Sequence, residues 1–285
     1  TTVETPEDIA QIQPNIEDMV LDWLAAGIDP ERSIVFVQSH VPEVMTLNSL
    51  LAMVTPLGWL MRVPTFKDKV RQMIETEDTV NYGLVGYPVL QTADIILYKA
   101  NTVPVGQDQV PHLELAREIV RRFNNRFGAI FPEPQASLTE DPLIVGLDGQ
   151  QKMSKTLDNH LELAATPEET TRRVLTAFTD PQRTRRDIPG RPNLCNVYSL
   201  HKTFSPAAEV TAVYDECVTA QWGCVDCKRH LAASINGYLE ELRESRESIK
   251  QRPGYVKEIL ADGAAKARAI AQETIKEVYS KMGLT

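Results

Sequence analysis

The stretch VPVGQDQVPHLELAREIVRRFNNRF, residues 103–127, decides the fold class. It begins with a short apolar run that ends at Gly106, which is typical of a buried strand followed by a loop. Pro111 then opens a segment with apolar residues at helical spacing, Leu113, Ile119 and Phe123 among them. Two further apolar runs, residues 33–38 and 143–146, also have the pattern of buried strands. Strands that alternate with helical segments predict an α/β fold with a parallel sheet.

Strand signals end after Lys155, and helical patterns fill the rest of the chain. Helices are predicted at residues 167–178, 193–204, 206–222, 227–251 and 255–282. At the other end, Thr5 and Pro6 predict a helix start, and a helix is expected from about residue 15 to residue 26, before Gly27. We therefore expect an α/β domain over residues 1–160 and an all-helical domain over residues 161–285.

The net charge of −9 excludes a uniformly basic nucleic-acid-binding protein but leaves room for a local basic face. Residues 1–160 carry a net charge of −10 and residues 161–285 a net charge of +1. Six arginines fall within residues 171–191, and a solvated face and a phosphate-contacting patch explain them equally well. No segment approaches the ~18 apolar residues that a membrane span needs, and no secretory signal is present, so a cytoplasmic protein is expected.

All four cysteines of the chain fall within 33 residues, at Cys195, Cys217, Cys224 and Cys227. A reducing compartment disfavours disulfides, and four thiolates that converge need a compensating cation, so a metal site is expected. The spacing has one CxxC pair and two more distant cysteines, whereas structural zinc usually takes two close pairs. The pattern therefore favours a [4Fe–4S] cluster, with zinc and four buried thiols as the alternatives.

A short loop, Lys152-Met153-Ser154-Lys155-Thr156, follows the strand candidate at residues 143–146. Two lysines three residues apart can neutralise the negative charge that develops on a leaving pyrophosphate. A mobile loop would let the lysines close on that group only during the reaction. The sequence therefore predicts a phosphate-binding loop, although such a lysine pair alone is also compatible with an ordinary exposed loop.

Residues 152–156 resemble the Lys-Met-Ser-Lys-Ser signature of class I aminoacyl-tRNA synthetases. Residues 86–98, 103–109 and 112–117 resemble the amino-acid-binding core of the tryptophanyl-tRNA synthetase family within that class, and residues 37–42 and 64–69 resemble the same family. The resemblance runs from about Ile28 to the C-terminus. It implies a Rossmann-like catalytic domain, a helical anticodon-binding domain, a homodimer, the substrates L-tryptophan, ATP with Mg²⁺ and tRNA, and no DNA or membrane partner. The cysteine pattern resembles the subset of this family that carries an iron–sulfur site.

The resemblance also implies roles for individual residues. An indole ring has one N–H donor and no acceptor, so Asp94 would accept the hydrogen bond from the N–H group and select tryptophan. The other residues expected to bind tryptophan are Tyr87, Gln91, Val103, Val105 and Gln109. Gly106, Asp108, Met153 and Ser154 are expected to bind ATP, and Lys69, Lys152 and Lys155 to act in catalysis. Arg172, Arg173, Lys228 and Arg229 are candidates for contacts with tRNA.

The first ATP-binding motif of the family, a Gly-containing loop with His-x-Gly-His or His-x-Gly-Asn, does not occur in the chain. We expect that motif to precede Thr1 in the natural protein. The leading hypothesis is a tryptophan–tRNA ligase. The alternatives are a non-catalytic iron–sulfur relative that binds RNA or protein, and the related tyrosine enzyme, which the core at residues 86–98 disfavours.

Overall fold

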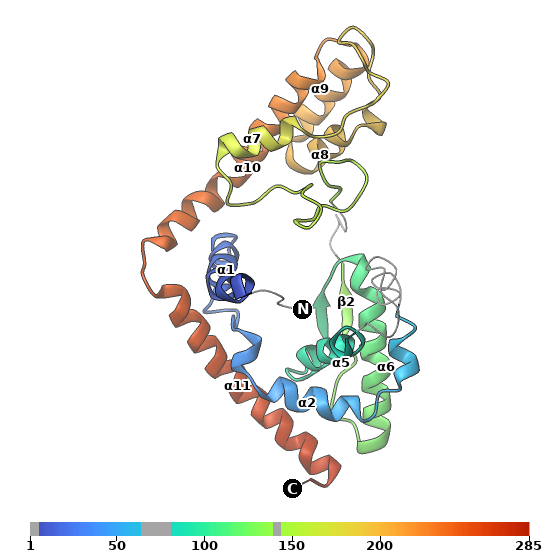
Figure 1. Ribbon diagram of the computed structural model, residues 1–285, viewed down its shortest axis with the longest axis vertical. Helices are drawn as coiled ribbons and strands as arrows, with labels where there is room; N and C mark the ends of the chain where they lie inside the picture. Colours follow the sequence, from blue (N-terminus) through green and yellow to red (C-terminus); the bar gives the residue numbers. More distant parts are fainter. Residues whose placement is uncertain (1–5, 64–80, 139–143, 285) are drawn as a thin grey trace. The chain divides into compact units, whose positions relative to one another are not determined.

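The computed structural model describes residues 6–63, 81–138 and 144–284, and the helices dominate it (Figure 1). The α-helices and strands, in chain order, are α1 (Pro6–Ala25), α2 (Glu43–Ala52), α3 (Leu57–Leu60), α5 (Tyr82–Ile96), β1 (Thr102–Pro104), α6 (Val110–Phe127), β2 (Gln135–Ser137), α7 (Pro167–Leu175), α8 (Asn196–Phe204), α9 (Ala207–Val218), α10 (Cys224–Lys250) and α11 (Tyr255–Met282). Short 3₁₀ turns lie at Gln38–His40, Gln107–Gln109 and Pro192–Leu194.

The helices predicted beyond residue 110 are confirmed, with ends that differ by a few residues. At the N-terminus, α1 is one helix that begins at Pro6 and passes through Pro14, where the sequence predicted a separate helix from about residue 15. Thr5, the predicted cap, lies outside the described residues. No helix in the described ranges is long and apolar enough to cross a membrane.

The sheet has two described strands, β1 and β2, which pair in parallel with Val103 opposite Ala136. The strand predicted at residues 103–106 is thus confirmed in part. The strand predicted at residues 33–38 is wrong, because this segment is extended without a neighbouring described strand and ends in a 3₁₀ turn. In the run predicted at 143–146, Leu143 lies outside the described residues, and the rest forms a single antiparallel bridge between Val145 and Lys152. An apolar run becomes a strand only where a partner completes its hydrogen bonds.

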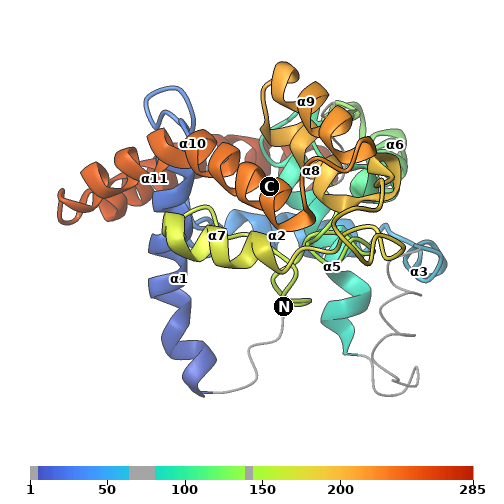
Figure 2. The same cartoon turned by 90° about the horizontal axis from the view of Figure 1, so that it is seen from above.

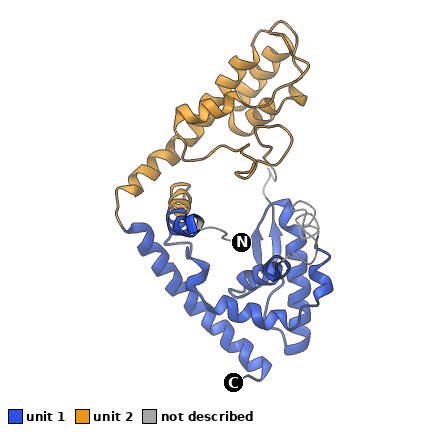
Figure 3. Cartoon of the chain, in the orientation of Figure 1, with its two compact units in different colours: residues 1–17, 29–142, 254–285 blue, residues 18–28, 143–253 orange. Residues whose placement is uncertain are grey.

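The chain forms two compact units (Figure 3). Unit 1 contains residues 1–17, 29–142 and 254–285, and unit 2 contains residues 18–28 and 143–253. This division differs from the expected boundary at residue 160. The α11 helix returns to unit 1, where it packs on α2, and the lysine-containing loop belongs to unit 2. The assignment of catalytic and anticodon-binding domains stays a prediction.

Unit 1 has one large apolar core built from α2, α5, α6 and α11. Phe123 is fully buried there and makes close ring contacts with Phe127 and Phe131. On α11, Gly263 allows a close backbone approach, because a Cβ atom at this position would lie 1.9 Å from the carbonyl oxygen of Val35. Burial of these apolar side chains is the main source of stability in such a unit.

Unit 2 is built around α10, which packs against α7 and α8 (Figures 1 and 2). Its core includes Leu147, Val174, Val197, Leu231 and Ile235. Within the same unit, the buried guanidinium group of Arg246 on α10 pairs with Asp18 and Asp22 of the N-terminal helix. The two carboxylates compensate a charge that would otherwise be costly to bury.

Candidate functional site

Asp94, the residue predicted to select the amino acid, lies on α5 and is held by Gln38. The amide Nε2 of Gln38 donates hydrogen bonds to Oδ1 and Oδ2 of Asp94, at 2.7 and 2.8 Å. Burial raises the pKa of the Asp94 carboxyl group above its usual value, and the hydrogen bond from Gln38 partly opposes this shift. The carboxylate is therefore oriented in partly desolvated surroundings, where a further hydrogen bond to it is strong.

Tyr87, Gln91 and Asp94 follow one another on α5 at helical spacing, so they lie along one side of this helix. The hydroxyl group of Tyr87 lies 2.7 Å from Nε2 of the buried His112 on α6, which connects the two helices. His112 thus helps to hold the side chain of Tyr87 in place.

The remaining residues predicted to bind tryptophan and ATP in unit 1 lie on β1 and the turn after it. Val103 is in β1, and the amide of Val105 donates to the carbonyl of Ser137 at 3.0 Å. Gly106 precedes the 3₁₀ turn that carries Asp108 and Gln109, and Nε2 of Gln109 donates to Oδ2 of Asp108 at 3.0 Å. These predicted residues and those on α5 belong to one compact unit. Lys69 lies outside the described residues.

The lysine-containing loop, residues 150–156, continues from a hairpin-like turn in unit 2. The amide of Gly146 donates to the carbonyl of Gln151, and the amide of Met153 donates to the carbonyl of Ile144. Gly149 adopts a φ of +70°, a conformation that favours glycine. Asp148 accepts from the amides of Gln150 and Gln151, which lowers the pKa of its carboxyl group. The side chains of Lys152 and Lys155 are exposed.

Asn159 organises this loop, a role that the sequence patterns did not predict. Its side chain accepts from the amide of Ser154 at 2.7 Å, and it donates to Oδ2 of Asp148 at 2.8 Å and to the carbonyl of Lys152 at 3.2 Å. Asn159 is buried, and a Cβ atom at Gly146 would lie 2.2 Å from its Nδ2. Together with the backbone hydrogen bond from Met153 to Ile144, this amide side chain thus holds the backbone of the Lys152–Lys155 segment. The only sequence signal that could have indicated this role was an asparagine shortly after the lysine pair.

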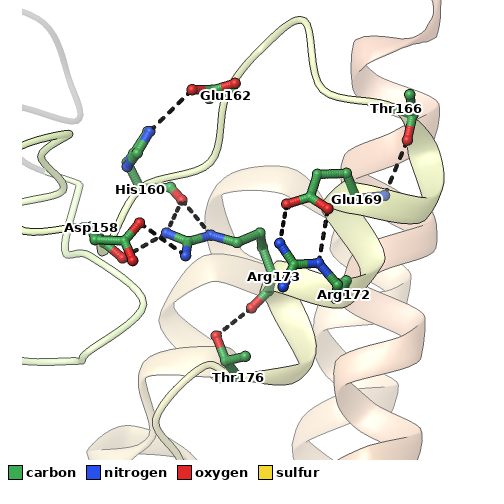
Figure 4. Close-up of polar contacts among 8 residues, drawn as sticks. All are labelled: Asp158, His160, Glu162, Thr166, Glu169, Arg172, Arg173 and Thr176. Carbon is green, nitrogen blue, oxygen red and sulfur yellow. Dashed lines mark hydrogen bonds and ion pairs between the residues drawn. The ribbon is translucent and has the colours of Figure 1, made fainter.

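The arginines between residues 172 and 191 are largely engaged within unit 2. Arg173 donates to the carbonyls of Asp158 and His160 and pairs with the carboxylate of Asp158, which anchors the segment after the loop (Figure 4). Arg172 pairs with Glu169 on the same helix (Figure 4). Of the other four arginines of this region, Arg183 donates to the carbonyls of Ile188 and Trp222. The remaining three form ion pairs, Arg185 with Asp187, Arg186 with Asp226, and Arg191 with Asp180, and the hydrogen bond from Arg191 lowers the pKa of Asp180 to about 2.

The remaining candidates for tRNA contacts lie at the start of α10. Lys228 donates to the carbonyl of Leu175 at 2.9 Å, and burial lowers its pKa. Arg229 has 67 % of its side chain exposed and lies 3.9 Å from Asp226. Of the four predicted residues, Arg172 and Arg229 are the most accessible, whereas Arg173 has an internal structural role.

The four cysteines lie in unit 2, at the start of α8, near the end of α9 and in the first turn of α10. Burial raises the pKa of Cys227 to about 12, with further increases from the charges of Cys195, Cys217 and Cys224. Within the described part of the chain, however, no three or more His, Cys, Asp or Glu side chains are grouped so as to hold a metal ion.

Comparisons with known proteins place the chain in a family. Residues 1–240 match the family described as tRNA synthetases class I (W and Y). A tryptophan–tRNA ligase of Deinococcus radiodurans is 42 % identical, with 98 % of this chain and 82 % of the relative aligned, and one of Thermotoga maritima is 41 % identical, with 98 % and 84 % aligned.

A solved structure is similar to the chain over nearly its whole length. The tryptophanyl-tRNA synthetase of Campylobacter jejuni, crystallised with ADP and tryptophan, superposes with a TM-score of 0.83 at 34 % identity, covering 98 % of this chain and 85 % of that chain. The fold is the Rossmann-like α/β fold of class I synthetases with helices in its C-terminal part. With this match and these relatives, the chain belongs to the class I tRNA synthetases of the tryptophan and tyrosine group.

Proposed function

We propose that the chain is a tryptophan–tRNA ligase, which activates L-tryptophan with ATP and transfers it to tRNA. Identity above 40 % to tryptophan–tRNA ligases over nearly the whole chain carries this proposal. Gln38 and Asp94 support the choice of tryptophan, because the oriented carboxylate is an acceptor suited to an indole N–H group. A phenylalanine side chain in its place would leave the partly buried carboxylate without this hydrogen bond.

In the first step, a carboxylate oxygen of tryptophan attacks the α-phosphorus of ATP. A new P–O bond forms, the bond between the α-phosphorus and its bridging oxygen breaks, and pyrophosphate leaves. In the second step, a ribose hydroxyl group at the tRNA end attacks the carbonyl carbon of the adenylate, loses its proton, and AMP leaves. The enzyme supplies no nucleophile, so catalysis depends on positioning and on charge neutralisation.

Lys152 and Lys155 would neutralise charge on the leaving pyrophosphate, with Met153 and Ser154 of the same loop against ATP. In unit 1, Lys69 would contact the triphosphate, and Gly106 and Asp108 would lie beside ATP, which enters with Mg²⁺. Tyr87 and Gln109 would hold the amino group of tryptophan, and Gln91, Val103 and Val105 would surround its ring.

The test is tryptophan-dependent exchange of pyrophosphate into ATP, measured with tryptophan, with tyrosine and with no amino acid. Exchange is expected with tryptophan alone. Lys155→Ala should reduce the exchange rate sharply and leave tryptophan affinity nearly unchanged, whereas Lys250→Ala, on the exposed face of α10, should behave like the parent chain. Exchange with tyrosine, or with no amino acid preference, would overturn the proposal, and an unchanged rate in Lys155→Ala would refute the role of the loop.

We further propose that Cys195, Cys217, Cys224 and Cys227 hold a [4Fe–4S] cluster. All four cysteines of the chain fall within 33 residues, and their spacing differs from the two close pairs that structural zinc usually takes, which is what favours a cluster. A bound cluster would neutralise the thiolates and fix the starts of α8 and α10, next to Lys228 and Arg229, which would face tRNA together with Arg172 and Arg173. Iron and sulfide analysis of anaerobically purified protein, with its visible absorption, tests this proposal. One zinc per chain without sulfide, or no metal at all, would overturn it.

The proposed enzyme is a cytoplasmic homodimer. Light scattering at micromolar concentration should give twice the mass of one chain, and the mass of a single chain would refute the dimer.

A further inference from the structure

Tyr98 lies just beyond the end of α5, and its hydroxyl group is buried without a hydrogen-bond partner among the described residues. Leu97, between the helix and Tyr98, keeps right-handed helical dihedral angles, so Tyr98 lies one turn beyond Asp94 on the same side of α5. A buried hydroxyl group that forms no hydrogen bond leaves its cost of desolvation uncompensated. A partner that forms in another state of the protein would recover that cost.

The segment before α2 runs along this side of α5 and contacts both residues. The backbone between Phe36 and Gln38 is extended at Val37, which directs the two side chains to the same side of the segment. The ring of Phe36 meets the ring of Tyr98 edge to face, with 5.6 Å between the ring centres. The amide of Gln38 donates to the carboxylate of Asp94. Two independent contacts thus place Tyr98 and Asp94 side by side against one segment.

A second carboxylate, that of Glu43 at the start of α2, also lies close to the hydroxyl group of Tyr98. Oε1 of Glu43 accepts from Arg268 and Gln272 of α11 at 3.1 Å each, whereas Oε2 is buried and no other described residue donates to it. Burial and the charges of Asp94 and Glu43 raise the pKa of Tyr98 to about 12. The hydroxyl group therefore keeps its proton and remains a donor.

The two carboxylates differ in how many donors they already have. Glu43 has two donors from α11, whereas Gln38 is the only described residue that donates to Asp94. A carboxylate offers about four lone-pair positions, so Asp94 has room for an indole N–H group and for one more donor.

We propose that Tyr98 is a positioning residue for Asp94 and that its hydroxyl group donates to this carboxylate when tryptophan is bound. An indole N–H group on one oxygen leaves Gln38 on the other, and the hydroxyl group of Tyr98 takes a free lone pair. The additional donor orients the oxygen that meets the indole ring and stabilises the ionised carboxylate. This inference rests on the proposed function, since it takes Asp94 as the acceptor for tryptophan.

The proposal predicts a pH dependence that a merely structural tyrosine lacks. The hydroxyl group stabilises ionised Asp94 more than protonated Asp94, so its contribution to tryptophan affinity is lost as the pH falls through the pKa of Asp94. Other charged or titratable residues also surround α5, and substitution of Asp94 separates their titration from its own. By the contacts above they are His40 in the turn of Gln38, Glu43 with Arg268, Tyr87 with His112, and Lys99, which pairs with Glu277.

The test measures tryptophan affinity of the full chain by calorimetry at a series of pH values below neutral. At neutral pH, Tyr98→Phe should bind tryptophan about tenfold more weakly, the usual value of a hydrogen bond to a charged group. The difference should shrink as the pH falls, so that the two curves converge where Asp94 is protonated. Added to Asp94→Asn, the same substitution should change the affinity by less than about twofold, because the charged partner is already absent.

Tyr279→Phe is the matched control, since it removes the hydroxyl group of another tyrosine of unit 1, on α11, and should leave the curve unchanged. A tryptophan analogue whose ring carries sulfur in place of the N–H group is the matched ligand. Tyr98→Phe should change its affinity by less than about twofold, since this ring donates nothing to Asp94. In urea without tryptophan, Tyr98→Phe should be at least as stable as the parent, because the hydroxyl group has no partner to lose.

Parallel pH curves for the parent and Tyr98→Phe, or an equal loss of affinity in Tyr279→Phe, would overturn the proposal. A less stable Tyr98→Phe with unchanged tryptophan affinity would also overturn it and would identify Glu43 as the acceptor. A parent chain that binds no tryptophan would overturn the proposed function and this inference with it. The parent and the variant therefore report the two proposals separately.

Discussion

Asp94 couples the predicted recognition of tryptophan to pH. Burial raises the pKa of its carboxyl group, although Gln38 donates to both oxygens. A raised pKa means that this carboxyl group takes up a proton at a higher pH than an exposed aspartate does. Once it is protonated, it loses the charge that strengthens its hydrogen bond to an indole N–H group.

We therefore expect tryptophan affinity to fall as the pH decreases through the raised pKa of Asp94. Asp94→Asn, which removes the charge and keeps an acceptor, should weaken tryptophan binding about tenfold at neutral pH, the usual value of a charged hydrogen bond. It should also abolish this part of the pH dependence. Isothermal titration calorimetry at a series of pH values below neutral measures both effects. An identical pH profile in the parent and the variant would assign the titration to another group.

Asn159 provides the second prediction at the scale of single residues. Asn159→Ala removes partners from the amide of Ser154, the carboxylate of Asp148 and the carbonyl of Lys152. The lost buried hydrogen bonds should lower the free energy of unfolding by about 1–3 kcal/mol. Because the lysine loop loses its support, the maximal rate of pyrophosphate exchange should fall more than the tryptophan KM rises.

Gly146→Ala would place a Cβ atom 2.2 Å from Nδ2 of Asn159. It should therefore displace the same side chain and give the same kinetic pattern. Asn193→Ala, at an exposed position of unit 2, is the control and should leave both quantities unchanged. A loss of stability with normal exchange kinetics would show that Asn159 stabilises the unit without positioning the loop.

These residues also show which features of the candidate site can be predicted from the sequence alone. The lysine pair and Asp94 stand within recognisable motifs, so a local pattern was enough to propose their roles, which stay predictions. The hydrogen bonds of Asn159 and Gln38 join positions whose proximity depends on how the chain turns between them. Gln38 lies 56 residues from Asp94, and no local spacing encodes that contact. Likewise, the arginine cluster and the family resemblance made Arg173 a candidate for tRNA contact, but no local pattern indicated that its guanidinium group binds Asp158 and His160.

At the scale of elements, the packing of α11 against the extended segment around Val35 depends on a glycine. A Cβ atom at Gly263 would meet the carbonyl oxygen of Val35 at 1.9 Å, so Gly263→Ala must displace either the helix or the extended segment. We expect a loss of about 1–3 kcal/mol in the free energy of unfolding, as for other overpacked sites. Gly237→Ala on α10 has nothing within 4 Å of the new atom and should be neutral or stabilising by up to about 1 kcal/mol. Urea denaturation of the two variants measures the difference, and equal stabilities would contradict the close approach of α11.

The same segment explains why helices were predicted better than strands. An α-helix completes its backbone hydrogen bonds within its own sequence, so the periodicity of α6 or α11 suffices to predict it. A strand needs a partner that the local sequence does not contain. Residues 33–38 are apolar enough for a strand, but within the described residues they pair with no other strand. In contrast, β2, with the polar sequence Gln135-Ala136-Ser137, pairs with β1 and was not predicted.

At the scale of the whole molecule, local patterns predicted two parts with a boundary at residue 160, whereas the two compact units divide the chain differently. The change from strand signals to helical signals lies near residue 155. Which segments form one compact unit, however, is decided by how their side chains pack. The α11 helix, more than 100 residues later, contributes Ala267, Ala271 and Val278 to the core of unit 1. The division therefore depends on contacts between distant segments, which a pass along the chain does not reveal.

Because each unit has its own apolar core, we expect the chain to unfold in two separable transitions on heating. Phe123→Ala removes a fully buried ring from the core of unit 1, and Leu231→Ala removes a fully buried side chain from the core of unit 2. Each should cost its own unit about 3–5 kcal/mol and lower one transition temperature while the other stays within about 2 °C. Differential scanning calorimetry measures both, and the exposed substitution Met53→Ala serves as a control that should move neither. A single transition that both core variants lower equally would mean that the two cores unfold as one cooperative structure, and the division into units would then have no thermodynamic counterpart.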